Sequence, residues 1–240
     1  MVRRTLLLTL VLGFCGCETP EPPVAAIPSR PAVPGRAPYP FAQFDQNVFH
    51  DTLLVQTSFD LGDSTFVMVA GNVEDTFEGL RLYRYRFTTD STVEHVAISS
   101  PAYDSWTMLP KFFPIDTSAV TDAMWVLANF GEKESWGQKV MLLDWEFMDV
   151  GFMDVAVPER VMEDDTLRLK RRDIGPFARY SEHGDTAVWH FDQDSVFLYS
   201  DQAGGADMVI AATRIRYTYH VDEGLVLWVD GQKRLVKKPA

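Results

Sequence analysis

Cysteine is nearly absent from this chain of 240 residues. The only two, Cys15 and Cys17, stand near the start of the sequence and are separated by a single glycine. Residues 18–240 therefore contain no thiol, which excludes disulfide bonds, thiol nucleophiles and thiolate metal ligands from them.

The common local motifs of catalysis are missing as well. The sequence has no Gly-x-Ser-x-Gly elbow, no His-Glu-x-x-His zinc motif, no phosphate-binding glycine loop and no EF-hand calcium loop. Five histidines are present, but none falls at metal-ligand spacing: His50, His95, His183, His190 and His220. We expect no metal and no cofactor, and the sequence assigns no catalytic residue.

Positive charge is also scarce. The chain has 22 lysines and arginines against 34 aspartates and glutamates, which gives a formal net charge of −12. Such an acidic protein is not expected to bind nucleic acid or to be attracted to anionic lipid headgroups.

The first sixteen residues have the pattern of an export signal. Arg3 and Arg4 precede an apolar stretch over residues 5–14, and Gly16 follows it. A transmembrane helix needs about 20 apolar residues, so this stretch is too short to remain as a spanning anchor. We predict that residues 1–16 form a signal peptide.

The pair Gly16-Cys17 at the end of this stretch resembles the lipobox of bacterial lipoprotein precursors, although Phe14-Cys15 departs from its usual upstream residues. The resemblance implies that Cys17 carries the lipid and that Cys15 leaves with the signal. It also implies an exported protein held in a membrane, which we expect to be the outer membrane, facing the periplasm or the cell surface. The alternative is an ordinary cleaved signal that frees a soluble secreted protein.

The region that follows is rich in proline. Residues 18–40 contain eight of the fourteen prolines and no periodic apolar pattern, so we predict that residues 17–40 are a disordered tether behind the lipidated cysteine. At ~3.1 Å per residue it would reach ~70 Å when extended. Residues 41–236 are expected to form a single all-β domain, and 237–240 a C-terminal tail.

Strand patterns dominate the predicted domain. "RIRYTYHV" at 214–221 alternates between apolar and polar residues, whereas runs such as "AMWVLANF" and "KVMLLDW" predict strands with both faces covered. Turn residues on both sides of "LVLWV" predict a three-stranded antiparallel meander near the C-terminus. About twelve strands favour an antiparallel β-sandwich or a strongly curled sheet, and a small propeller-like arrangement is the alternative.

The segment "NFGEKESWGQK", residues 129–139, is the first candidate binding surface. It interrupts two apolar strands and is longer than a usual hairpin loop, and long loops are often functional. An exposed Trp136 there would stack on a sugar or anchor a partner protein, or would instead fold back over the end of the sheet. The candidate binding residues are Asn129, Glu132, Glu134 and Trp136.

Basic side chains that alternate along three strands form the second candidate surface. They would make one positive strip able to bind phosphates or carboxylates if the three strands were neighbours, but they would pair with acids across strands if they were not. The residues are Arg84, Arg86, Arg168, Lys170, Arg214 and Arg216.

Acidic pairs could place two carboxylates across a glycosidic bond. They are Glu132 with Glu134, Asp192 with Asp194, and Glu163 with Asp164 and Asp165. The sequence favours a noncatalytic, lipid-anchored envelope protein that binds another envelope protein or a glycan, with the membrane as a further partner through Cys17. The alternatives are a lipoprotein glycan hydrolase and a purely structural accessory subunit.

Overall fold

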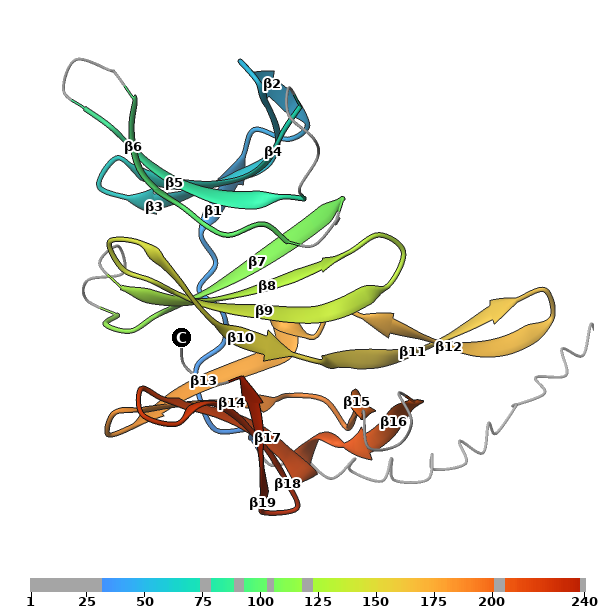
Figure 1. The fold of residues 1–240 in the computed structure, drawn as a ribbon. Coiled ribbons are helices and arrows are strands. Elements are labelled where there is room, and N and C mark those ends of the chain that lie inside the picture. The colour runs from blue at the N-terminus through green and yellow to red at the C-terminus, as the bar shows by residue number, and fades with distance from the viewer. Residues whose placement is uncertain are drawn as a thin grey trace, which may run out of the picture. The chain divides into compact units, whose positions relative to one another are not determined.

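The computed structural model describes residues 32–73, 79–88, 93–102, 106–117, 123–200 and 206–237. From Val33 on they belong to one compact unit, and β-strand is their dominant secondary structure, at 69% (Figure 1). The predicted signal peptide, Cys17 and most of the tether lie outside the described residues, as do residues 238–240 of the predicted tail.

Within the described residues, the strands form four antiparallel sheets, and none of these closes into a barrel. The first sheet contains β1 (Ala42–Phe44), β2 (Val48–His50), β3 (Leu53–Gly62), β4 (Thr65–Asn72), β5 (Arg81–Phe87) and β6 (Val93–Ile98). The central sheet contains β7 (Thr107–Pro114), β8 (Met124–Gly131), β9 (Ser135–Leu143) and β10 (Phe147–Met153).

The chain then alternates between the other two sheets. The arm sheet contains β11 (Val155–Glu163), β12 (Thr166–Arg172), β15 (Ser195–Ser200) and β16 (Ala206–Ala211). The C-terminal sheet contains β13 (Ala178–His183), β14 (Thr186–Phe191), β17 (Ile215–His220), β18 (Gly224–Val229) and β19 (Gln232–Lys237). Two short 3-10 turns, η1 (Gly175–Phe177) and η3 (Ala212–Arg214), precede β13 and β17.

The central sheet is buried on both faces, as its apolar runs predict. Along β8, Met124 and Val126 belong to the core shared with the first sheet, whereas Trp125 and Leu127 belong to the core shared with the C-terminal sheet. Successive strand residues point to opposite faces, so a strand between two sheets must be apolar at nearly every position. Trp125 meets Trp189 of β14 edge to face, with ring centroids 5.1 Å apart.

These packed antiparallel layers confirm the all-β sandwich class. The C-terminal meander is confirmed too, because β17 pairs with β18 and β18 pairs with β19. The described residues contain nineteen strands rather than about twelve. The missed strands are short or carry charged residues and proline, as β11 does at Pro158, so apolar patterning alone did not reveal them.

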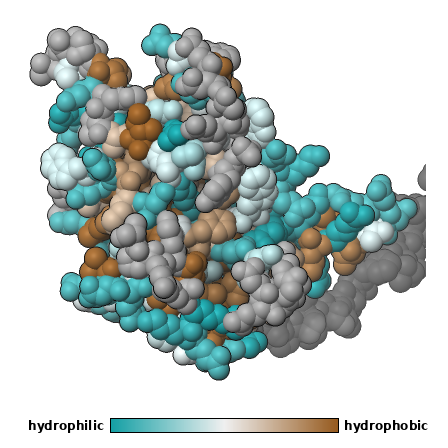
Figure 2. Space-filling model, viewed as in Figure 1, coloured by the Kyte–Doolittle hydropathy of each residue, from teal (hydrophilic) through white to brown (hydrophobic). Residues whose placement is uncertain are grey.

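Residues 157–172 of β11 and β12 form a hairpin, called the arm here, that projects from the layers (Figure 1). Opposite residues of the two strands share a face, which places Met162 beside Leu167 on an exposed apolar side. The other side carries ion pairs that join Glu159 to Arg172 and Glu163 to Lys170. Figure 2 shows apolar surface on this arm among hydrophilic side chains.

The N-terminal part of the domain contacts three sheets in turn, and we call residues 36–44 the strap. Arg36 exchanges backbone hydrogen bonds with Tyr180 of β13, and the amide of Tyr39 donates to Phe112 of β7. The last three residues of the strap form β1, which pairs with β3. Pairing with the domain therefore begins before residue 41, within the segment predicted to be a tether.

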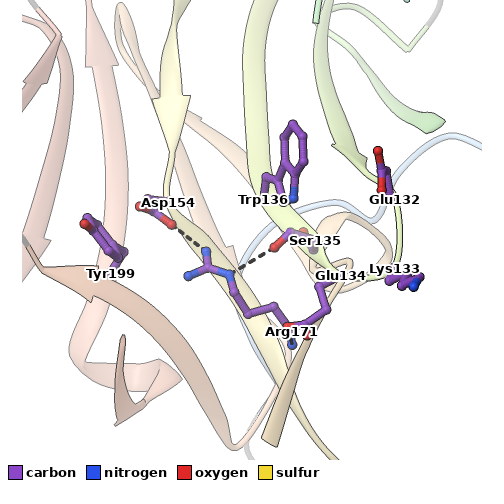
Figure 3. A pocket seen from close by; sticks show the side chains of 8 residues that line it. All are labelled: Glu132, Lys133, Glu134, Ser135, Trp136, Asp154, Arg171 and Tyr199. Carbon is purple, nitrogen blue, oxygen red and sulfur yellow. Dashed lines mark hydrogen bonds and ion pairs between the residues drawn. The ribbon is translucent and has the colours of Figure 1, made fainter. Parts of the chain in front are cut away.

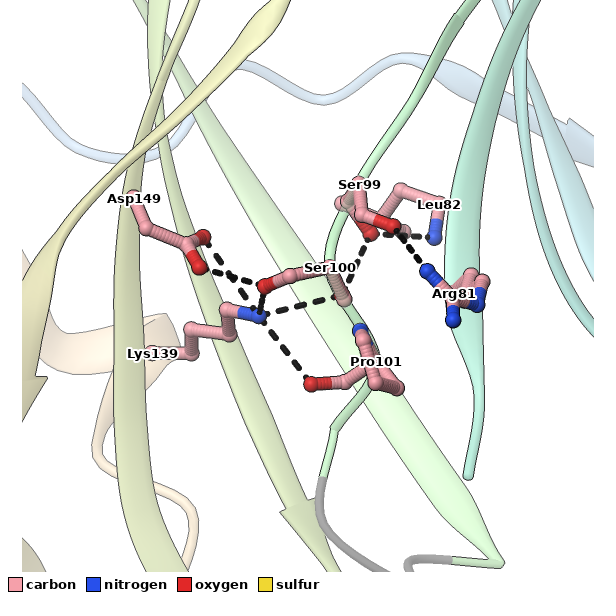
Figure 4. Close-up of polar contacts among 7 residues, drawn as sticks. All are labelled: Arg81, Leu82, Ser99, Ser100, Pro101, Lys139 and Asp149. Atoms are coloured by element: carbon pink, nitrogen blue, oxygen red, sulfur yellow. Dashed lines mark hydrogen bonds and ion pairs between the residues drawn. The ribbon is translucent and has the colours of Figure 1, made fainter. Parts of the chain in front are cut away.

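A buried lysine links the first and central sheets (Figure 4). Lys139 of β9 donates from Nζ to the carbonyl oxygens of Ser100 and Pro101, at 3.0 and 3.1 Å, and lies 3.4 Å from a carboxylate oxygen of Asp149. Ser100 follows β6. The neighbouring Ser99 stays bound to β5, because its amide donates to the carbonyl oxygen of Leu82 and its own carbonyl oxygen accepts from Arg81. The Lys139 contacts therefore hold the segment that follows β6 against the central sheet.

Candidate functional site

A groove of about 530 Å³ lies where the turn between β8 and β9 meets the start of the arm (Figure 3). Segments far apart in the sequence contribute side chains to it: the turn with the start of β9, the residue between β10 and β11, β12, and β15. The lining residues are Glu132, Lys133, Glu134, Ser135, Trp136, Asp154, Arg171 and Tyr199.

The predicted eleven-residue loop is a tight hairpin instead. β8 continues to Gly131 and β9 begins at Ser135, which leaves a turn of residues 132–134. The prediction was wrong because polar residues in this segment pair within the strands. Gly131 permits the tight turn, since an added Cβ would lie 2.0 Å from the backbone oxygen of Glu134.

A β-bulge turns Trp136 toward the groove. Phe130 pairs with Gly137 and Gly131 pairs with Ser135, so Trp136 is the extra residue without a partner across the hairpin. Bulges commonly redirect a side chain in this way. Trp136 is 42% exposed and packs edge-on against Phe130, with ring centroids 5.9 Å apart. Trp136 therefore combines the two predicted arrangements: part of its ring packs against the sheet, and the rest is exposed in the groove.

Arg171 forms the base of the groove. Its Nε donates to the carbonyl oxygen of Ser135 at 3.0 Å, and its guanidinium forms an ion pair with Asp154 (Figure 3). The backbone amide of Arg171 donates to Oε2 of Glu134 at 3.2 Å. Only 13% of the Arg171 side chain is exposed. A guanidinium fixed by several partners has little rotamer freedom left to lose when a ligand binds.

A second aromatic ring, Tyr199 of β15, lines the groove beyond Asp154. The backbone amide of Tyr199 donates to the carbonyl oxygen of Asp154, which fixes the two residues side by side. Tyr199 is 39% exposed. In Figure 3, Asp154 and the guanidinium of Arg171 lie between Trp136 and Tyr199.

Asn129 does not line the groove but lies in a buried polar network behind it. Its side-chain oxygen accepts from Ser135 Oγ and from Gln138 Nε2. Gln138 also donates to Asp173 at 2.9 Å, and the amide of Gly175 donates to the same carboxylate oxygen at 2.8 Å. This network supports the strand from which Trp136 projects.

Burial shifts the pKa values of two charged groups in this region. Loss of hydration raises the pKa of the Asp173 carboxyl, and the Gly175 amide, Lys111 and Gln138 offset part of that rise. Burial likewise lowers the pKa of the Lys111 ammonium, which the charge of Asp173 partly restores. Beneath the groove, burial raises the pKa of the Tyr217 hydroxyl, and the negative charge of Asp154 raises it further.

The structure does not bring the predicted basic residues into one strip. Their strands, β5, β12 and the η3–β17 segment, belong to three different sheets. Most of them meet acids instead: Arg86 with Glu94, Arg168 and Lys170 with Glu163, and Arg214 with Asp230. Arg84 donates to the backbone oxygen of Asp144, and Arg216 lies over the ring of Trp228.

The predicted acidic pairs are engaged in turns and ion pairs. Glu134 accepts from Arg171, whereas Glu132 points in another direction (Figure 3). Asp192 pairs with Arg179 at 2.7 Å. Asp164 and Asp165 form the tip of the arm with positive φ angles of 49° and 58°. These roles are the ordinary ones of acidic residues in turns.

Sequence reasoning identified Glu132, Glu134 and Trp136 but missed Asp154, Arg171 and Tyr199. Arg171 lies in "TLRLKRR", where alternation singled out Arg168 and Lys170 on the opposite face of the strand. Tyr199 could have been singled out as a candidate binding residue, because it is a large aromatic residue at the end of the run "SVFLY". Its place near the turn could not have been predicted, because it depends on the pairing of β11 with β15.

Within the described ranges, no group of three or more His, Cys, Asp or Glu side chains is arranged to hold a metal ion. The same residues contain no helix long and apolar enough to cross a membrane. Comparisons with protein-family models, with curated proteins and with solved structures gave no match to this chain. A function can therefore be inferred only from the side chains that line the groove.

Proposed function

We propose that this protein is a noncatalytic, lipid-anchored envelope protein whose groove binds a glycan. The observation that carries the proposal is the pairing of two exposed aromatic rings, Trp136 and Tyr199, with the fixed polar groups of Arg171 and Asp154 between them. The apolar face of a sugar ring packs on aromatic side chains, while its hydroxyls need donors and acceptors held in place.

The arrangement favours binding over hydrolysis. A glycosidase needs two carboxylates that face each other across the substrate, one of them able to donate a proton. Asp154 is instead held in an ion pair with Arg171, and Glu134 accepts a hydrogen bond from the backbone of Arg171. Both groups are thereby used to position the base of the groove.

The lipid anchor on Cys17 is a proposal from the lipobox resemblance. Because the strap pairs with the domain from Arg36, only residues 18–35 would remain as a free tether. At ~3.1 Å per residue, an extended tether of this length reaches roughly 55 Å. The groove would then bind envelope material within that distance of the membrane.

Tryptophan substitution tests glycan binding. The detergent-solubilised full chain is titrated with N-acetylglucosamine oligomers, followed by intrinsic fluorescence and calorimetry. Trp136→Ala should weaken binding at least tenfold, which corresponds to about 1.4 kcal/mol. The matched control is Trp145→Ala, because Trp145 is 77% exposed and lies outside the groove. Absence of saturable binding, or equal loss in both variants, would rule out the groove as a glycan site.

Metabolic labelling with a fatty-acid probe tests the anchor separately. Cys17→Ser should abolish labelling, whereas Cys15→Ser should leave it intact. Labelling that survives Cys17→Ser would contradict lipidation at this residue.

A protein partner is the second candidate function, and the arm favours it. Met162, Leu167 and Leu169 expose apolar surface on one side of a projecting hairpin. Exposed apolar patches on soluble domains often mark protein interfaces. Crosslinking in the native envelope distinguishes the two candidates, because the arm would crosslink to a protein and the groove to a glycan.

A further inference from the structure

The outer face of the C-terminal sheet carries basic and aromatic side chains in one row across five strands. Direct cross-strand pairs join Arg179 to His190, Arg216 to Trp228, and Trp228 to Lys233. Trp189 pairs with Tyr217 and both point into the core, so the adjacent His190 and Arg216 project together from the opposite face.

A small pocket of about 220 Å³ lies within this row. Its main polar and aromatic lining residues are His190, Thr213, Arg214, Arg216, Trp228 and Asp230. None of them lines the groove near Trp136, which draws on the central and arm sheets. The pocket is therefore a second site, independent of the proposed glycan groove.

Arg216 is held in place by an aromatic ring rather than by an acid. Its guanidinium carbon lies 5.0 Å from the centroid of the Trp228 ring. The indole nitrogen of Trp228 donates to Thr218 Oγ1 at 2.8 Å, which fixes the ring. Among the described residues, Arg216 forms no ion pair. A guanidinium stacked by its face keeps the N–H groups at its edge available for an anion.

The acid in the pocket is already neutralised. Asp230 accepts from both Nε and Nη2 of Arg214, with the Nε contact at 2.7 Å. This forked pair uses two of the five N–H donors of a guanidinium, and the others remain on Arg214. Among the described residues that line the pocket, no second acid is present to neutralise Arg216.

His190 experiences this uncompensated charge. Burial lowers the pKa of its imidazole, and the nearby charges of Arg216 and His183 lower it further. The other cation beside it, Arg179, is paired with Asp192. An anion between His190 and Arg216 would reverse this effect and favour the protonated imidazole.

We propose that this pocket binds a phosphate group through Arg216, His190 and the remaining donors of Arg214. Two guanidinium groups and an imidazole, from η3, β17 and β14, supply several N–H donors, which suits a tetrahedral dianion with three or four acceptor oxygens better than a carboxylate with two. Trp228 would hold the Arg216 guanidinium in position and pack beside the ester-linked part of the ligand. A volume of about 220 Å³ accepts a phosphate group and its nearest atoms but not a whole glycan.

Titration with inorganic phosphate tests the proposal on the detergent-solubilised full chain at constant ionic strength set by chloride. Nuclear magnetic resonance of the His190 imidazole should show a saturable change and a pKa that rises when phosphate is present. Arg216→Gln should weaken binding at least tenfold and abolish the pKa rise. The matched control Arg86→Gln, which removes an exposed arginine paired with Glu94, should leave both unchanged.

Three outcomes would overturn the assignment: a response that does not saturate, equal effects of Arg216→Gln and Arg86→Gln, or binding of acetate as tight as that of phosphate. Arg216→Lys keeps the charge but loses the fork, so it should bind phosphate more weakly than the native chain and more tightly than Arg216→Gln. Trp136→Ala should not change phosphate binding. Failure of the glycan groove and failure of this pocket can therefore be told apart.

Discussion

Lys139 is a charged residue inside the sandwich, with 8% of its surface exposed. Its ammonium is satisfied by carbonyl oxygens on the segment that follows β6 and by the carboxylate of Asp149 on β10. A buried ammonium without such partners would be strongly unfavourable. Lys139 therefore helps to bind the connecting segment to the sheet, together with Ser100 Oγ, which donates to Asp149.

Replacing Lys139 by Ala should lower the free energy of unfolding by about 2–4 kcal/mol, because the carbonyl oxygens lose their donor and Asp149 loses its ion-pair partner. Urea unfolding followed by tryptophan fluorescence measures the change. Lys133→Ala, in the exposed turn between β8 and β9, should change stability by no more than about 0.5 kcal/mol. Similar losses in both variants would show that burial of Lys139 is not responsible.

Asp173 should make stability depend on pH. Because burial raises its pKa in the folded state, the folded chain holds this proton more tightly than the unfolded chain does. Its stabilising contribution is complete below the ordinary carboxyl pKa of 3.8 and is lost as the pH rises through the raised value. Asp173→Asn removes the ionisation and keeps a side-chain oxygen that can accept from Gly175.

Urea midpoints measured from pH 3.8 to 7 test this linkage. The stability of the native chain relative to Asp173→Asn should fall as the pH rises. Asp165→Asn, at the exposed tip of the arm, provides the control and should follow the native pH profile. A constant difference between the native chain and Asp173→Asn would mean that Asp173 titrates alike in the folded and unfolded states.

At the scale of elements, the β8–β9 hairpin decides where the groove lies. The bulge at Trp136 depends on Gly137, whose φ angle is 132°. A Cβ at this position would lie 2.5 Å from Phe152 Cζ and 2.6 Å from the carbonyl oxygen of Met153. The neighbouring strand β10 therefore approaches too closely for any other residue.

Gly137→Ala should destabilise the domain by about 2–4 kcal/mol, through the clash with β10 together with the unfavourable φ. Gly184→Ala isolates the φ contribution, since Gly184 has a φ of 59° and nothing within 4 Å of an added Cβ. That control should cost about 1 kcal/mol. Equal losses of stability in Gly137→Ala and Gly184→Ala would show that the clash with β10 adds no cost beyond the unfavourable φ.

The sequence predicted a strand correctly where a single apolar pattern, either continuous or alternating, ran along its whole length. Both faces of β8 are covered, so its continuous apolar run identified it, and the alternation of β17 identified its inner and outer faces. The prediction of a long loop at residues 129–139 was wrong because Gln138 and Lys139 are polar yet buried within a strand. Their partners, Asp173 and Ser100, are distant in the sequence, so local polarity indicated a loop.

At the scale of the whole domain, the strap forms backbone hydrogen bonds with three sheets that share no strand pairing with one another. Arg36 pairs with the C-terminal sheet, Tyr39 with the central sheet, and β1 with the first sheet. Phe41 packs against the core between the first and central sheets, with its ring 5.4 Å from that of Phe112. The strap thus contributes apolar burial as well as backbone pairing.

Deleting residues 18–41 should lower the free energy of unfolding by at least about 2 kcal/mol, because it removes the packing of Phe41 and both backbone bridges. Deleting residues 18–32 alone should leave the stability unchanged. Chemical denaturation of the two deletion variants beside the full chain makes the comparison. Equal stability of both variants would show that the strap does not support the domain.

The sequence by itself determined the all-β class, the both-faced burial of the central strands and the C-terminal meander, because periods of two residues and turn chemistry are local properties. It also supplied Trp136 as a candidate and the cysteine pattern behind the proposed anchor. Only the tertiary structure decided which side chains meet. Arg171, Asp154 and Tyr199 reach Trp136, and His190 reaches Arg216, through pairing between strands distant in the chain, and such pairing depends on how whole sheets pack.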